Sequence, residues 1–291
     1  MRKIFSFVCC CITAALTSCE KPMLGDEPAA APKGNVVLTF SATGAQTRAA
    51  AAPMSDHFQK LNVMLFNDDG TKYFDKVRTQ YATDENFGQM SLTLPAGEYT
   101  VVAVGHSSAK SATIKSPELV QFTASDGQKL TDTFCYCGQI EVRNENLQQT
   151  FQMRRVAAMV QFRLTDESVP ENFARMVIAY TGGSANFNPT TSEGTTKSTQ
   201  SEARVRTDTS TYQVFTFPYL SDTGTLKMTL TAYDADGNTL RQRVFDAVPV
   251  ARNRITTYTG QFFDGTDGNF NQSTFGFSVL GEWGGEDNYT F

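Results

Sequence analysis

Apolar and polar residues alternate along several stretches of this chain, and this period of two restricts the possible folds more than any other feature. The clearest example is residues 154–165, where every even position from 156 to 164 is apolar and Arg155, Gln161 and Arg163 occupy odd positions. Successive side chains of a β-strand point to opposite faces of the sheet, whereas a helix repeats every 3.6 residues. The stretch therefore predicts a strand with one buried face.

Comparable patterns predict strands throughout the chain. Turn signals separate them at residues 67–70, 95–97 and 234–238, where Asn, Asp, Pro and Gly gather. The 22 Phe and 10 Tyr residues suit the same fold class, because aromatic residues favour strands. The other expected strands are residues 36–40, 61–66, 90–94, 99–103, 134–142, 176–180, 212–217, 226–232, 240–244, 254–263 and 274–280.

This spacing predicts an all-β chain of two tandem β-sandwiches. The polar stretch 144–149 marks the expected boundary, which gives domains at residues 35–147 and 148–291. Residues 182–202 are rich in Gly, Ser, Thr and Asn and predict a long exposed loop.

The N-terminus has the order of a bacterial lipoprotein signal. Arg2 and Lys3 precede an uncharged run over residues 4–17, which is shorter than the ~20 residues of a spanning helix. The run ends in Leu-Thr-Ser-Cys, which resembles a lipobox, so we expect cleavage between Ser18 and Cys19 and acylation of Cys19. Residues 1–18 are then the signal peptide and 19–34 a flexible tether. The alternative is a buried free cysteine or a chance match.

Charge and motif content narrow the function. Loss of Arg2 and Lys3 with the signal lowers Lys and Arg from 25 to 23 against 30 Asp and Glu, so the net charge changes from -5 to -7. An acidic chain without a basic patch does not favour nucleic acid as a partner. We find no P-loop, dinucleotide-binding, nucleophile-elbow or zinc-protease motif, so we expect no enzyme, no cofactor and no small-molecule substrate.

The residues that commonly bind metals have plainer interpretations. Cys135 and Cys137 are expected on one face of a strand, ~7 Å apart, which disfavours both a disulfide and a zinc site. His57 and His106 lack partners at metal or triad spacing, and the calcium-loop pattern that begins at Asp234 fails at Phe245. We therefore expect no metal site.

Several sequence blocks, taken in order, resemble the fimbrillin-type family of pilus anchor and minor-subunit lipoproteins, which belong to the type V pili of Gram-negative anaerobes. These blocks are the lipobox at Cys19, residues 87–106, 129–138, 154–164, 180–184 and 248–263, and the closing residues 282–283 with 289–291. The resemblance implies two transthyretin-like, Greek-key β-sandwiches. It also implies a surface protein in the outer membrane and fimbrium, with pilus stalk or accessory subunits as partners.

The resemblance also suggests how subunits join. Stalk subunits of such pili are cut after an arginine, which removes the first strand and opens a groove for a strand of a neighbour. Here the matching site is Arg48–Ala49, although Arg48 fits an ordinary solvated loop equally well. A cut there would also separate Cys19 from both domains, so the anchor role and the processed role exclude each other.

Three functions remain open at this stage. The resemblance favours a pilus anchor that keeps its first strand and offers another element to the stalk, for which residues 283–291 with Trp283, Tyr289 and Phe291 are the candidate donor. Those residues could instead close their own sheet. The second function is a processed stalk or tip subunit with adhesin activity. The third is a surface glycan-binding lipoprotein. Such a protein should expose several aromatic residues on one platform, so the single tryptophan, Trp283, argues against it, although Tyr219 or Tyr212 could substitute.

Overall fold

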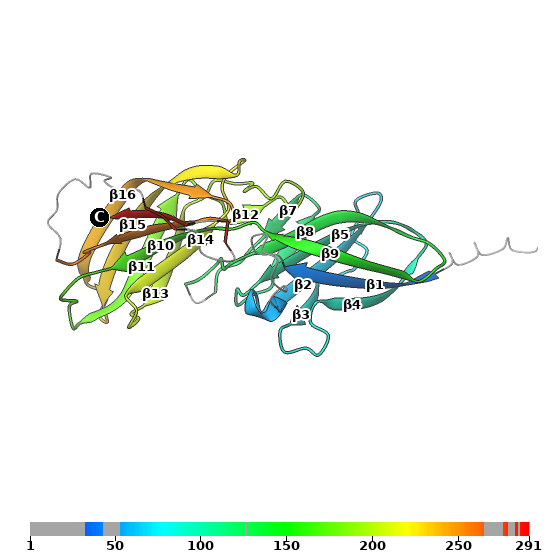
Figure 1. Ribbon diagram of the computed structural model, residues 1–291, viewed down its shortest axis with the longest axis horizontal. Coiled ribbons are helices and arrows are strands. Elements are labelled where there is room, and N and C mark those ends of the chain that lie inside the picture. Colours follow the sequence, from blue (N-terminus) through cyan, green and yellow to red (C-terminus); the bar gives the residue numbers. More distant parts are fainter. Residues whose placement is uncertain are drawn as a thin grey trace, which may run out of the picture. The chain divides into compact units, whose positions relative to one another are not determined.

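The computed structural model describes residues 33–42, 53–125, 127–264, 276–278, 283–284 and 286–290. Pro32–Phe291 group into one compact unit. Its described residues form strands joined by turns, apart from one short 3-10 helix, η1 (Met54–Asp56) (Figure 1). The chain is therefore all-β, as the alternation predicted.

The N-terminal part of this unit is built on a seven-stranded sheet. In spatial order its strands are β3 (Arg78–Tyr81), β2 (Lys60–Asn67), β5 (Gly97–His106), β8 (Phe134–Val142), β9 (Leu147–Arg155), β1 (Lys33–Ala42) and β4 (Gln89–Pro95). β8 and β9 pair only at Phe134–Arg155 and Cys135–Arg154, so the sheet is joined narrowly at this point. Buried apolar side chains from both arms of the sheet contribute to one core.

Two further sheets form the C-terminal part, around a second core. One has the order β14 (Thr211–Thr216), β10 (Ala158–Leu164), β17 (Ile255–Gly260), β19 (Glu286–Thr290) and β18 (Gly276–Ser278). The other has the order β13 (Gln200–Val205), β11 (Phe173–Thr181), β15 (Thr223–Asp234) and β16 (Thr239–Ala251). A small sheet joins the two parts through β12 (Asn186–Phe187), β7 (Leu119–Gln121) and β6 (Thr113–Ser116).

The single strand predicted over residues 154–165 is wrong in one respect. Arg154 and Arg155 end β9, and β10 begins at Ala158 in another sheet. Alternation does not reveal the change because Val156 and Ala157 stay fully buried across the break. Their backbone groups find new partners: the Val156 N–H donates to Thr133 O at 2.9 Å, and Ala157 O accepts from Asn253 N–H at 2.9 Å.

The turn at residues 67–70 forms as predicted. Gly70 has a φ of 78°, and its N–H donates to Asn67 O at 2.9 Å. Only Gly adopts this left-handed conformation without steric cost, which explains its place in the turn. The sequence did not indicate β3, which begins eight residues later at Arg78.

The exposed loop predicted over residues 182–202 is also corrected. The segment is not one exposed loop, because β12 and the start of β13 lie within it, although Thr190, Thr191, Thr196 and Thr199 remain exposed. Ser184 and Phe187 are fully buried, and Glu202 is nearly so. Hydrogen bonds satisfy the polar groups: Ser184 Oγ donates to Asn186 O at 2.6 Å.

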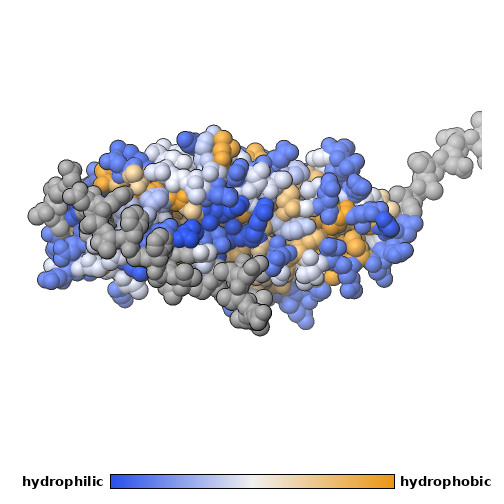
Figure 2. Space-filling view, turned by 45° about the horizontal axis from the view of Figure 1, so that its top comes forward, coloured by the Kyte–Doolittle hydropathy of each residue, from blue (hydrophilic) through white to orange (hydrophobic). Residues whose placement is uncertain are grey.

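Figure 2 shows how hydrophilic and hydrophobic residues mingle on one face of the surface.

Candidate functional site

The first strand, β1, lies between two neighbours and is the element that matters most for the expected strand exchange. It runs parallel to β9, with Val36 opposite Leu147 and Ala42 opposite Met153. It runs antiparallel to β4, with Lys33 opposite Pro95 and Thr39 opposite Gln89. Removal of β1 would therefore expose the backbone groups of β9 and of β4 together.

Alternate side chains of β1 enter the N-terminal core. Val36, Leu38, Phe40 and Ala42 are all buried, while Thr39 between them is partly exposed. The Phe40 ring lies 5.5 Å from that of Phe151 on β9. Each such large apolar side chain stabilises the fold by about 1.5–3 kcal/mol through burial. β1 thus fills a slot with the chemistry of a donated strand.

A cavity of about 460 Å³ lies where β1 ends. Ala42 and Pro53, which flank residues 43–52, both line it, as do the acidic residues Asp84 and Glu85. Arg48 and Ala49 themselves lie outside the described residues, and so do Ser18, Cys19 and Phe291.

The C-terminal segment occupies a place in the chain's own sheet. β19 runs parallel to β17, with Tyr258 opposite Tyr289, and antiparallel to β18. The rings of Tyr258 and Tyr289 stack at 4.7 Å. Arg254 Nη2 donates to Asp287 Oδ1 at 2.7 Å. This arrangement is the self-closing alternative, and the donor role stays a prediction.

Trp283 contacts the junction between the two parts of the unit. Its ring lies 4.0 Å from the guanidinium carbon of Arg155, the last residue of β9, and stacks on Phe215 at 6.4 Å. Arg155 also lies 4.5 Å from the ring of Phe134. A cation over an aromatic face is attracted by the ring quadrupole, so Arg155 holds the C-terminal segment against the N-terminal sheet.

An ion pair with Asp132 fixes Arg155 in this position, and the side chains of Arg155 and Asp132 are 2% and 22% exposed. Its Nε donates to Asp132 Oδ1 at 2.8 Å, and its Nη2 donates to Asp132 Oδ2 at 2.9 Å. Nη1 donates to Asn253 Oδ1 at 3.2 Å. Burial raises the pKa of the Asp132 carboxyl, and Arg155 opposes that rise through hydrogen bonding and charge. Sequence reasoning placed Arg155 on a polar strand face, and nothing in the pattern pointed to this partner.

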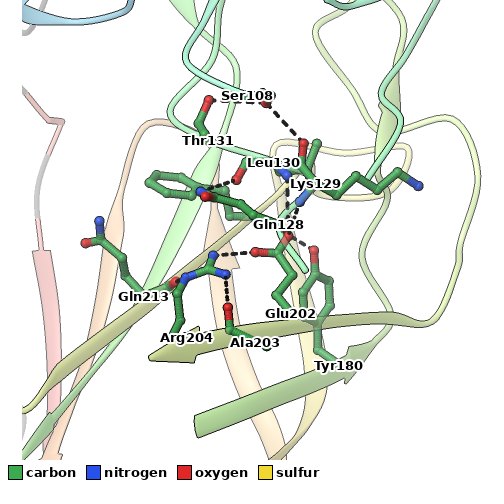
Figure 3. A network of polar contacts seen from close by, with 11 residues as sticks. Ser108, Gln128, Lys129, Leu130, Thr131, Tyr180, Glu202, Ala203, Arg204 and Gln213 are labelled. Carbon is green, nitrogen blue, oxygen red and sulfur yellow. Dashed lines mark hydrogen bonds and ion pairs between the residues drawn. The ribbon is translucent and has the colours of Figure 1, made fainter. Parts of the chain in front are cut away.

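A second polar network joins the two parts on another side (Figure 3). Glu202 of β13 pairs with Arg204, and its carboxylate accepts from the backbone N–H groups of Lys129 and Leu130 at 3.4 and 3.3 Å. Ser108 Oγ donates to Lys129 O at 3.0 Å on the other face of that loop. The buried Glu202 is therefore satisfied by groups from both parts, and its role is structural.

The remaining candidate residues lie in packed or hydrogen-bonded positions. Cys135 and Cys137 are free thiols, and burial raises the pKa of both, so neither is an activated nucleophile. His106 is fully buried, with Nε2 2.7 Å from Asn62 Oδ1. Asp234 caps a tight turn through Asn238 N–H at 2.8 Å. Among the described residues, no three His, Cys, Asp or Glu side chains could hold a metal ion.

Two further findings bear on the alternatives. Tyr212 is only 2% exposed, so it cannot supply a sugar-stacking platform. Within the described part of the chain, no helix is long and apolar enough to span a bilayer.

Comparison with known proteins gives a family match over most of the chain. The model of a family of unknown function, DUF6562, matches residues 28–289. No curated protein matches the sequence.

Solved structures with a similar arrangement share little sequence with this chain. The fimbrial anchor protein Mfa2 of Porphyromonas gingivalis is 15% identical, with a TM-score of 0.41 over 72% of this chain and 82% of that one. A fimbrial assembly protein of Parabacteroides distasonis is 14% identical, with a TM-score of 0.39 over 79% and 90%. The tip fimbrial protein Mfa3 of Porphyromonas gingivalis is 11% identical, with a TM-score of 0.38 over 75% and 81%. The proteins similar to this chain thus include the fimbrial class that the sequence blocks resemble.

Proposed function

The chain belongs to DUF6562, a family of unknown function, and we propose that it is a lipid-anchored structural subunit of a surface pilus, attaching the base of the fibre to the outer membrane. The observation that carries the proposal is the position of β1. This strand follows the lipobox cysteine, Cys19, and precedes Arg48, and its buried side chains and two neighbours fix it in the N-terminal sheet.

A chain that keeps an acylated Cys19 must also keep β1, because both lie before Arg48 in the sequence. Cleavage after Arg48 would remove β1 together with Cys19, and three of its side chains, Val36, Leu38 and Phe40, would each lose about 1.5–3 kcal/mol of burial. An uncut chain keeps both. Its acyl chains each contribute about 0.8 kcal/mol of membrane affinity per buried methylene, and two or more chains anchor stably.

The proposed fold is two tandem transthyretin-like sandwiches, and the sequence places their bounds at residues 35–147 and 148–291. The two hydrophobic cores support this division. Because β9 pairs with β1 and β8, the first domain is better ended after Arg155. The expected partners are stalk or accessory subunits, reached through β-strand complementation.

The mature N-terminus tests the anchor role directly. Mass spectrometry of the envelope protein should find an acylated Cys19, and Cys19→Ala should leave the chain unacylated and release it from detergent-phase fractions. Cys11→Ala lies in the signal and serves as the matched control, because it should leave acylation unchanged. A mature chain that begins at Ala49 would contradict the anchor role and identify a processed stalk or tip subunit.

A glycan-binding role has less support from the aromatic residues. Trp283 is stacked between Arg155 and Phe215, and Tyr212 is buried, which leaves Tyr219 beside Lys197 from the expected set. Binding of several related sugars by the purified chain on a glycan array, lost in Tyr219→Ala, would reverse this ranking.

A further inference from the structure

The outer edge of β4 differs from the other long sheet edges among the described residues. Natural proteins protect such edges with charges, prolines or bulges, because unpaired backbone groups attract foreign strands. β13 carries Glu202 and Arg204, and β16 carries several charges and Pro249. β14 has no charge, but Arg204 Nε covers its edge by donating to Gln213 O at 3.2 Å. From Gln89 to Leu94, β4 has no charged residue at all.

The hydrogen bonds around β4 show which backbone groups face outward. Gly88 O accepts from Phe40 N–H at 2.8 Å and therefore points toward β1. Gln89 O accepts from the side-chain Nε2 of Gln80 on β3 at 2.7 Å and therefore points away from β1. Backbone groups of alternate residues share an edge, so the N–H and C=O of Ser91 and Thr93 also point outward. Pro95 ends this row of donors, since it has no N–H.

A groove runs beside this edge. Its volume is about 650 Å³, and its lining includes Tyr73, Phe74, Leu92 and two charged residues, Asp75 and Arg78. Leu92 is only partly buried, although Met90 and Leu94 on either side of it are buried. A strand paired with β4 would place every second one of its own side chains on the face that carries Leu92. These side chains would cover Leu92, so apolar burial would add to the backbone pairing.

Charge narrows the chemistry of the occupant. The Arg78 guanidinium lies 4.9 Å from the ring of Phe74 and makes no ion pair with any described residue. Arg78 is exposed, and an exposed guanidinium binds a carboxylate in a bidentate manner and becomes less hydrated when a partner closes over it. An acidic side chain on the incoming strand would meet that requirement.

We infer that the outer edge of β4 receives an extended strand from a neighbouring pilus subunit, with apolar residues at alternate positions and an acidic residue opposite Arg78. This inference rests on the proposed pilus function and gives it a contact site. It also explains how a chain that keeps β1 in its slot can still join a partner by strand pairing. The partner strand extends the sheet beyond β4, and β1 stays in its place.

Replacement of Ser91 by proline tests the edge with little disturbance of the fold. Its N–H faces away from β1, and proline is tolerated on edge strands at such positions. Ser91→Pro removes one donor and places a ring where the partner must lie, so strand addition should weaken by about tenfold or more. Ser91→Ala keeps the donor and is the matched control.

The assay is retention of pili on cells that make them. The expected result is that Ser91→Pro cells carry normal amounts of acylated protein but shed pili into the medium, while Ser91→Ala cells retain them. Arg78→Glu should shed pili as well, and Arg78→Lys should shed fewer. If Ser91→Pro lowers the amount of folded protein, Thr93→Lys replaces it, because a charge at this exposed position blocks the same edge. Retention of pili by folded Ser91→Pro and Thr93→Lys variants would overturn the inference.

Photo-crosslinking identifies the occupant. A benzophenone amino acid at Thr93, in intact envelopes, should crosslink to a pilus subunit, whereas the same group at the exposed Val244 of β16 should not. Crosslinks from Thr93 only to a second copy of this chain, or only within the chain, would overturn the inference. The proposed function fails separately: it is wrong if deletion of the whole protein leaves pili attached, whatever the edge variants do.

Discussion

Replacing Arg155 with alanine removes a side chain that is 2% exposed and contacts both parts of the unit. Asp132 loses its bidentate partner, Asn253 loses a donor, and the rings of Phe134 and Trp283 lose the cation between them. Removing one member of a buried ion pair costs about 3–5 kcal/mol, mainly because the other charge stays buried. We therefore expect Arg155→Ala to lower the free energy of unfolding by about 4 kcal/mol.

Urea unfolding measures this loss, and the chain contains a convenient probe. Trp283 is its only tryptophan, so intrinsic fluorescence reports on the Arg155 contact while circular dichroism follows the sheets. With a urea dependence of about 3 kcal/mol per molar, the midpoint should fall by about 1–1.5 M. The two signals should change together in the wild type if the unit unfolds cooperatively.

A double variant separates the charge effect from the packing effect. Arg155→Met with Asp132→Leu removes both charges of this pair, so the double variant should be clearly more stable than Arg155→Ala. The reasoning is refuted if Arg155→Ala lowers the free energy of unfolding by less than about 1 kcal/mol with unchanged Trp283 emission.

Three further predictions follow from single sites. Burial lowers the pKa of His106 from 6.5 to about 3, so the unfolded chain takes up a proton at a higher pH than the folded chain does. The free energy of unfolding should therefore fall as the pH drops from 6.5 towards 3, by up to about 1.4 kcal/mol per pH unit. An NMR titration should find the His106 ring neutral at pH 5, and a protonated ring there would contradict this prediction. Phe40→Ala should lower the free energy of unfolding by about 3–5 kcal/mol, measured by thermal or urea unfolding. Thr39→Ala, on the opposite face of β1, should lower it by about 1 kcal/mol or less. Equal losses would show that β1 does not anchor the core. Gly182 has a φ of 102°, and a Cβ at this position would lie 2.5 Å from Thr225 O. Gly182→Ala should therefore lower the free energy of unfolding by at least about 1–3 kcal/mol in the same unfolding experiments. A variant as stable as the wild type would refute the close approach.

The sequence predicted the strands better than it predicted their neighbours. Alternation marked the buried faces of β1, β4 and β10 correctly, because it reflects which side chains leave water. It could not reveal that the pattern around Val156 passes from one sheet into another, since both sides of the break are buried. Backbone pairing between distant strands has no local signature in composition.

The candidate site was only partly predictable for a related reason. The predicted lipobox at Cys19 and the predicted cleavage site at Arg48 rest on local motifs, and their residues lie outside the described part of the chain. Arg155 and Glu202 matter through partners far away in the sequence, and each looked like an ordinary polar residue on an exposed face. The uncharged edge of β4 was visible in the letters, but its position at the margin of a sheet was not.

The pairing of β1 with β9 also constrains the order of events during biogenesis. Ser41 Oγ donates to Phe151 O, a contact between residues 110 positions apart. Strand pairing over such separations forms slowly, because the intervening loop must close first. A chain made from its N-terminus cannot seat its first strand until β9, which ends at Arg155, has also been made. For that interval the new chain presents an open slot beside β9, and the unpaired backbone groups there attract foreign strands.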